Sequence, residues 1–88
     1  MSLDVFGAMA DPTRRRILEL VAGNERTVGE LVFELGMEQT AVSKHLRILR
    51  DLGFVDSRAV GRQRLYRLQA GPLDEAIRWL SSLRSPSR

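Results

Sequence analysis

The chain has no cysteine, which excludes disulfides and thiolate metal sites. It has a single histidine, His45, so a metal site built from paired histidines is not expected either. No apolar run approaches the ~20 residues that a membrane-spanning helix needs. The first residues include Asp4 and Asp11 and lack the cationic start of a signal peptide. We therefore expect no metal, no cofactor, no membrane partner and a cytoplasmic location.

The sequence also lacks the residue combinations that mark common catalytic sites. No nucleophile is paired with a base, and no glycine-rich phosphate loop is followed by a lysine. His45 has no partner for general acid–base work. An enzyme is therefore not expected.

What is present describes one small folded domain, residues 1–88. Apolar residues make up 43% of the chain and charged residues 28%, a globular rather than a disordered composition. A chain of 88 residues buries a small share of its surface, so pairing with a second copy would strengthen its core.

Positive charge is concentrated in the second half of the chain. Residues 1–43 carry four arginines and seven acids, whereas residues 44–67 carry seven cations and two acids. The seven cations are Lys44, Arg47, Arg50, Arg58, Arg62, Arg64 and Arg67. Such a local excess is typical of a surface that binds nucleic acid. A basic protein without an anionic partner is the alternative.

Residues 27–53 predict two helices joined by a turn at Gly36. Thr27 and Glu30 have the spacing of a capping box, which starts the first helix. On a helix of ~100° per residue that starts at Gln39, every apolar residue falls on one side. The opposite side carries Gln39, Thr40, Ser43, Lys44, Arg47, Arg50 and Asp51.

This polar side predicts a DNA-recognition helix. Its first half offers short hydrogen-bonding groups, and its second half offers cations. We expect base contacts from Gln39, Thr40, Ser43 and Lys44 in the major groove. Arg47 and Arg50 would neutralise phosphates. A module that binds an acidic protein is the alternative, and an RNA-binding protein is disfavoured because no aromatic platform is present. His45 falls on the apolar side, where holding a backbone carbonyl is a better interpretation than a base contact.

Two further helices are predicted before this pair. Residues 3–10 form a brief apolar segment, and Asp11 followed by Pro12 is a strong helix start. That second helix ends at Gly23 and Asn24. Arg14 lies within its apolar stripe, where an ion pair with a carboxylate is favoured over a DNA contact.

A basic hairpin is predicted after the recognition helix. Residues 54–58 and 63–69 favour strands, with residues 59–62 as the connection. Arg58, Arg62 and Arg64 crowd its tip without an acid among them. A basic hairpin in this position indicates a DNA-binding wing whose three arginines neutralise phosphates. A merely soluble hairpin is the alternative.

The last helix begins at Gly71 and Pro72, and its apolar side is wider than docking on one neighbour requires. We therefore expect residues 72–84 and 3–10 to form a dimer face. The alternative is that Trp79 completes the monomer core. The expected dimer residues are Leu3, Phe6, Met9, Ala76, Trp79, Leu80 and Leu83.

Four passages together resemble the ArsR/SmtB family of winged helix-turn-helix regulators. They are ADPTRRRIL from Ala10, TVGEL from Thr27, QTAVSKHLRILR from Gln39 and GRQRLYRL from Gly61. The resemblance implies a mainly α fold with about five helices and a two-stranded wing. It also implies a homodimer that binds a pseudo-palindromic operator and represses transcription. Base-reading positions of the family fall on Gln39, Thr40, Ser43 and Lys44, and wing positions fall on Arg62 and Arg64.

The chain also departs from the family pattern. Metal-sensing members place cysteines where this chain has Thr27, Gly29 and Val32, none of which is a soft ligand. The last helix offers Asp74 and Glu75 but no histidine for zinc. Glu38 stands where a small capping residue is common. These departures predict a member without a metal sensor.

Overall fold

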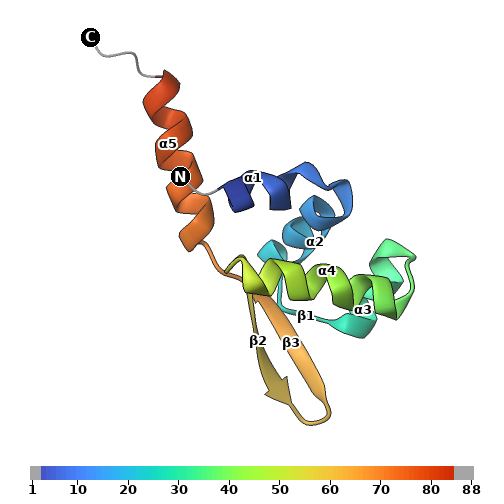
Figure 1. Ribbon diagram of the computed structural model, residues 1–88. Coiled ribbons are helices and arrows are strands. Elements are labelled where there is room, and N and C mark those ends of the chain that lie inside the picture. Colours follow the sequence, from blue (N-terminus) through green and yellow to red (C-terminus); the bar gives the residue numbers. More distant parts are fainter. Residues whose placement is uncertain (1–2, 85–88) are drawn as a thin grey trace.

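The computed structural model describes the backbone of residues 3–84 and the side chains of residues 6–84. Five helices and three strands form a winged helix-turn-helix (Figure 1), the mainly α fold that the sequence predicts. The helices are α1 Leu3–Ala10, α2 Pro12–Gly23, α3 Val28–Leu35, α4 Gln39–Asp51 and α5 Gly71–Arg84. The strands are β1 Arg26–Thr27, β2 Val55–Val60 and β3 Gln63–Leu68.

Local capping sets the boundaries of α2 and α3. The Asp11 carboxylate accepts hydrogen bonds from the backbone amides of Thr13 at 2.8 Å and Arg14 at 3.1 Å. The Thr27 hydroxyl accepts from the Glu30 amide at 3.1 Å, and the Glu30 carboxylate accepts from the Thr27 amide at 2.8 Å. Gly36 ends α3 with a φ of 63°, a left-handed conformation that glycine adopts without strain. The predicted caps are confirmed.

One hydrophobic core joins the helices to the base of the hairpin. Each of α2, α3 and α4 contributes the apolar side that its periodicity predicts, and the segment after α4 adds a fully buried phenylalanine. The buried residues are Ala8, Ile17, Leu18, Leu20, Val21, Leu31, Val42, Leu46, Leu49, Phe54, Val55 and Ala76. Because α4 packs into this core through one side, its polar side is left free.

The hairpin belongs to a three-stranded antiparallel sheet in the order β1-β3-β2. The sequence did not predict β1, which has two residues and pairs Thr27 with Leu65. The predicted connection 59–62 was also too long. Val60 pairs with Gln63, so the turn contains only Gly61 and Arg62, and Gly61 has a φ of 62°. This two-residue turn with glycine first is a tight hairpin connection, so β2 reaches farther toward the tip than predicted.

Helix α5 leaves the body of the domain and projects away from it (Figure 1). Ala76, one of the predicted dimer residues, is buried in the core of the single chain and is not exposed on the outer side of α5. Beyond it, the large apolar side chains of Ile77, Trp79, Leu80 and Leu83 are all exposed, the last to 62%.

Helices α1 and α5 touch through aromatic rings. The rings of Phe6 and Trp79 meet edge to face at 5.6 Å. Met9 packs on the core, whereas the side chain of Leu3 lies outside the described residues. Trp79 remains 42% exposed, so it does not complete the monomer core as the alternative interpretation required.

Candidate nucleic-acid interface

The polar side of α4 is open to solvent along its whole length. Its buried side chains are Val42, Leu46 and Leu49, which are at most 1% exposed. The exposed residues are Gln39, Thr40, Ser43, Lys44, Arg47, Arg50 and Asp51. This division into two sides is confirmed residue by residue. The helix therefore presents uncharged hydrogen-bonding groups at its start and cations farther along, with the hydrophobic side fixed in the core.

The start of α4 has no side-chain cap. Glu38 occupies the N-cap position with φ −70° and ψ 150°, but its carboxylate accepts no hydrogen bond from the first turn. Its backbone carbonyl accepts from the Val42 amide at 3.1 Å. The backbone amides of the first turn, which begins with Gln39 and Thr40, therefore donate no hydrogen bond to the Glu38 side chain.

His45 lies on the packing side of α4 and not on the reading side. It is half-buried, as expected, but its partner is the Arg14 guanidinium at 3.5 Å and not a backbone carbonyl. Arg14 also donates to the carbonyl of Gly7 at 3.3 Å, and among the described side chains it forms no ion pair with a carboxylate. Arg15 donates to the Met9 carbonyl at 2.7 Å. Together the two arginines satisfy carbonyls at the end of α1 and hold it against α2.

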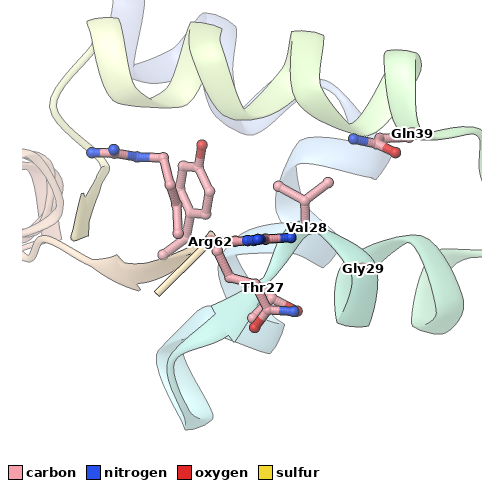
Figure 2. A pocket seen from close by; sticks show the side chains of 8 residues that line it. Thr27, Val28, Gly29, Gln39 and Arg62 are labelled. Carbon is pink, nitrogen blue, oxygen red and sulfur yellow. The ribbon is translucent and has the colours of Figure 1, made fainter. Parts of the chain in front are cut away.

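A groove of about 300 Å³ lies between the wing and the starts of α3 and α4. Figure 2 shows Thr27 and Val28 from the start of α3 and Gln39 from the start of α4 around it. The wing contributes Arg62 and Arg64, so three predicted DNA-binding residues meet here. The remaining lining residues, Val28, Gly29, Gln63 and Tyr66, are not among the predicted DNA-binding residues.

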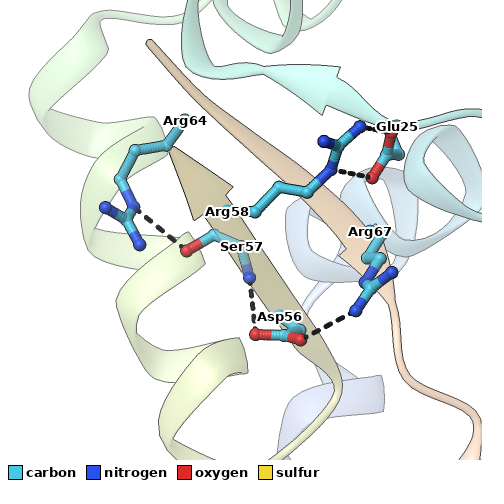
Figure 3. Close-up of polar contacts among 6 residues, drawn as sticks. All are labelled: Glu25, Asp56, Ser57, Arg58, Arg64 and Arg67. Atoms are coloured by element: carbon cyan, nitrogen blue, oxygen red, sulfur yellow. Dashed lines mark hydrogen bonds and ion pairs between the residues drawn. The ribbon is translucent and has the colours of Figure 1, made fainter. Parts of the chain in front are cut away.

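The three wing arginines do not form one cluster. Residues paired across antiparallel strands point to the same side of a sheet, so Arg58 lies with Leu65, and Arg64 lies with Ala59 on the opposite side. Arg64 shares its side with Tyr66, which packs on the core, and donates to the Ser57 hydroxyl at 3.1 Å. Arg58 lies on the outer side of the sheet (Figure 3).

Arg58 is bound by an acid that the sequence did not place beside it. Its Nε and one terminal nitrogen contact the two carboxylate oxygens of Glu25 at 3.1 Å and 2.9 Å. The hydrogen bond from Arg58 lowers the pKa of Glu25, and Glu25 raises the pKa of Arg58. The expectation that no acid interrupts the arginine cluster is therefore wrong. In the described part of the chain, Lys44, Arg47, Arg50 and Arg62 take part in no ion pair.

The described residues contain no group of histidine, cysteine, aspartate and glutamate side chains that could hold a metal ion. None of the helices within residues 3–84 is long and apolar enough to cross a membrane. The chemistry that this surface does offer is hydrogen bonding and positive charge on a convex helix beside a basic wing. Hydrogen-bonding groups suit the base edges in the grooves of duplex DNA, and positive charge suits its phosphates.

Comparison with known sequences agrees with this geometry. Residues 11–57 match the model of the family described as "Bacterial regulatory protein, arsR family". The chain is 32% identical over 77 residues to the transcriptional repressor SdpR of Bacillus subtilis. That match covers 88% of this chain and 86% of SdpR. It is 43% identical over 61 residues to a probable mercury resistance operon repressor of Streptomyces lividans. There the match covers 69% of this chain but only 49% of the relative.

Solved structures of related sequence share the whole fold. An ArsR-like transcriptional regulator from Rhodococcus sp. RHA1 superposes with a TM-score of 0.87 at 32% sequence identity. The superposition covers 93% of this chain and 75% of that one. The shared region therefore includes the helices, the wing and most of the remaining chain.

Proposed function

This chain belongs to the arsR family of bacterial regulatory proteins and is a DNA-binding transcriptional regulator, and we propose that it acts as a homodimeric repressor at a pseudo-palindromic operator. The observation that carries the proposal is the exposed polar side of α4, which meets the basic wing at one groove. The relative SdpR is named a transcriptional repressor, which supports repression as the proposed effect of this chain on transcription. The alternative of a module for acidic proteins is not favoured by these relatives.

In the proposed complex, α4 enters the major groove. The first half of its exposed side reads base edges through Gln39, Thr40, Ser43 and Lys44. A glutamine amide matches the paired donor and acceptor of adenine, and a lysine ammonium matches the acceptors of guanine. Their place at the start of the helix fits the way recognition helices approach bases.

The remaining cations position the protein on the DNA backbone. Arg47 and Arg50 lie farther along the same exposed side, and Arg62 and Arg64 line the groove between wing and helices. Arginine side chains suit phosphate because they present several donors in a fixed plane. These contacts add affinity and register but no sequence preference.

The dimer would form through α1 and α5. Helix α5 exposes Trp79, Leu80 and Leu83, and Phe6 of α1 lies against Trp79. Covering these side chains with a second copy removes apolar surface from water. A two-fold dimer places two recognition helices about 34–36 Å apart, one turn of DNA. The cytoplasm is the proposed location because the regulated DNA lies there.

The test is selection of bound fragments from random duplex DNA, followed by affinity measurements on the selected site. We expect a two-fold symmetric site, and we expect Lys44→Ala to cost about 1–3 kcal/mol there and to relax preference at one base position of each half-site. Arg47→Ala is the matched control, because it removes one cation from the same side of α4 and should leave base preference unchanged. Unchanged preference in Lys44→Ala would show that α4 does not read bases through this residue.

A further inference from the structure

The outer side of the wing carries a bidentate ion pair that spans the sheet. Arg58 lies on β2, whereas Glu25 lies immediately before β1, and β3 runs between these strands. Figure 3 shows the Arg58 side chain reaching across β3 to the carboxylate. The two contacts of 2.9 Å and 3.1 Å join the flat guanidinium to both oxygens, a geometry that restricts orientation as well as distance.

The same side of the sheet is electrically balanced. Arg67 contacts Asp56 at 3.3 Å on this side, so two arginines face two acids. The opposite side and the tip carry Arg64 and Arg62, which line the groove beside α4. The wing therefore has one neutral side and one basic side. Arg58 points away from the groove in which DNA is proposed to bind.

The pair also lies where the hairpin has little other support. Val55 at the start of β2 is buried, but Arg58, Ala59 and Val60 are exposed. Glu25, by contrast, precedes a segment tied to the body of the domain. The Arg26 side chain donates to the Leu20 carbonyl at 3.2 Å, and Thr27 is held by the capping box. The ion pair thus links the exposed half of β2 directly to the fixed start of α3.

We propose that Glu25 and Arg58 are positioning residues for DNA binding, which hold the wing at the angle that brings Arg62 and Arg64 to the phosphate backbone. Arg58 then acts through Glu25 and does not contact DNA. This proposal rests on the proposed function, because a wing angle matters only if the wing meets DNA. It differs from the sequence expectation, in which Arg58 is itself a phosphate contact.

The two roles of Arg58 make opposite predictions for Glu25→Gln. If Arg58 contacts phosphate, freeing it from an acid should tighten binding and steepen the salt dependence. If the pair positions the wing, binding should weaken by about threefold, the scale of an exposed ion pair, with the salt slope unchanged. The matched control is Asp56→Asn, which removes one negative charge from the same side without touching the link to β1. It should bind as well as the native chain or more tightly.

The reversed pair separates the roles further. Glu25→Arg combined with Arg58→Glu keeps the net charge and exchanges the two partners. The positioning role predicts that this double variant regains most of the native affinity, whereas Arg58→Glu alone stays weak. If the double variant is as weak as Arg58→Glu alone, the positioning role is overturned.

Hydrogen exchange of the wing amides gives a readout without DNA. Glu25→Gln should speed exchange of the β3 amides that pair with β2, and the reversed pair should slow it again. Native exchange in Glu25→Gln would contradict the proposal. Failure of the native chain to bind any duplex would instead refute the proposed function, and the exchange data would still decide whether the pair holds the wing.

Discussion

Individual residues in this chain have roles that depend on a few short contacts. Asp11 is the clearest case, because its carboxylate accepts two backbone amides at the start of α2. The Arg14 amide, with smaller contributions from the Thr13 amide and nearby positive charge, holds the pKa of Asp11 below its usual 3.8. A carboxylate with a lowered pKa stabilises the fold when ionised.

Acid should therefore weaken α2 in a way that depends on Asp11. Its contribution to the free energy of unfolding is complete above pH 3.8 and is lost as the pH falls through the lower pKa of the folded state. Asparagine also caps helices but does not titrate in this range. We expect Asp11→Asn to retain stability at neutral pH and to show a shallower loss below pH 3.8 in urea unfolding followed by circular dichroism. An acid profile identical to that of the native chain would refute this role.

At the level of whole elements, α4 and the wing form the proposed DNA interface, and each has one weak point. The start of α4 lacks a side-chain cap because Glu38 makes no hydrogen bond to the first turn. The wing depends on a two-residue turn and on contacts that span its strands. The sequence predicted both elements, but it placed the end of β2 two residues too early.

Replacing Glu38 by serine should improve α4. The backbone at this position is already extended, as an N-cap requires, so the hydroxyl can reach a free amide. We expect a gain of about 1 kcal/mol in unfolding free energy and tighter DNA binding, because an acid beside the reading residues is removed. Glu38→Gln is the control, since it removes the charge without supplying a cap. Equal stability of the two variants would contradict the capping argument.

The wing should contribute affinity without sequence preference. Arg64→Ala removes one cation from the groove beside α4. It should weaken binding to selected and random duplexes alike and reduce the salt slope by about one unit. Fluorescence anisotropy over a salt series measures both quantities. A loss confined to the selected site would show that Arg64 reads bases.

Across the whole molecule, apolar and charged surfaces are separated. Lys44, Arg47, Arg50 and Arg62, which take part in no ion pair within the described residues, lie on α4 and the wing tip. Most of the large exposed apolar side chains, namely Ile77, Trp79, Leu80 and Leu83, lie instead on the projecting part of α5. One end of the domain therefore suits DNA, and the other suits a second copy. In the proposed complex, this separation allows DNA and a second copy to be bound at the same time.

Disrupting α5 should separate the proposed dimer without unfolding the chain. Leu80 is 42% exposed and is not part of the buried core, so Leu80→Asp leaves the core residues unchanged. We expect a monomer by light scattering at micromolar concentration and a large loss of affinity for a symmetric site. Phe33→Asp is the matched control, because Phe33 is 84% exposed on α3 and away from α5. A Leu80→Asp protein that remains dimeric would rule out this interface.

Apart from the length of the hairpin turn, the sequence alone determined the features that rest on neighbours a few residues apart. Four such features follow from spacings within one or two helical turns. They are the cap at Asp11, the capping box from Thr27 to Glu30, the glycine that ends α3 and the two sides of α4. These signals were enough to indicate the helices, the hairpin and the family. Each depends on residues within one helix or at its ends.

Only the tertiary structure decided the contacts between distant parts of the chain. The strand β1 exists because it pairs with β3, and two residues carry no periodicity of their own. Arg58 and Glu25 are 33 residues apart, and Arg14 and His45 are 31 apart, so no local pattern connects them. Ala76 and Trp79 lie one helical turn apart, yet the packing of α5 buries the first and exposes the second. Folding therefore assigned Arg58 to the outer side of the wing and left the exposed polar side of α4 as predicted.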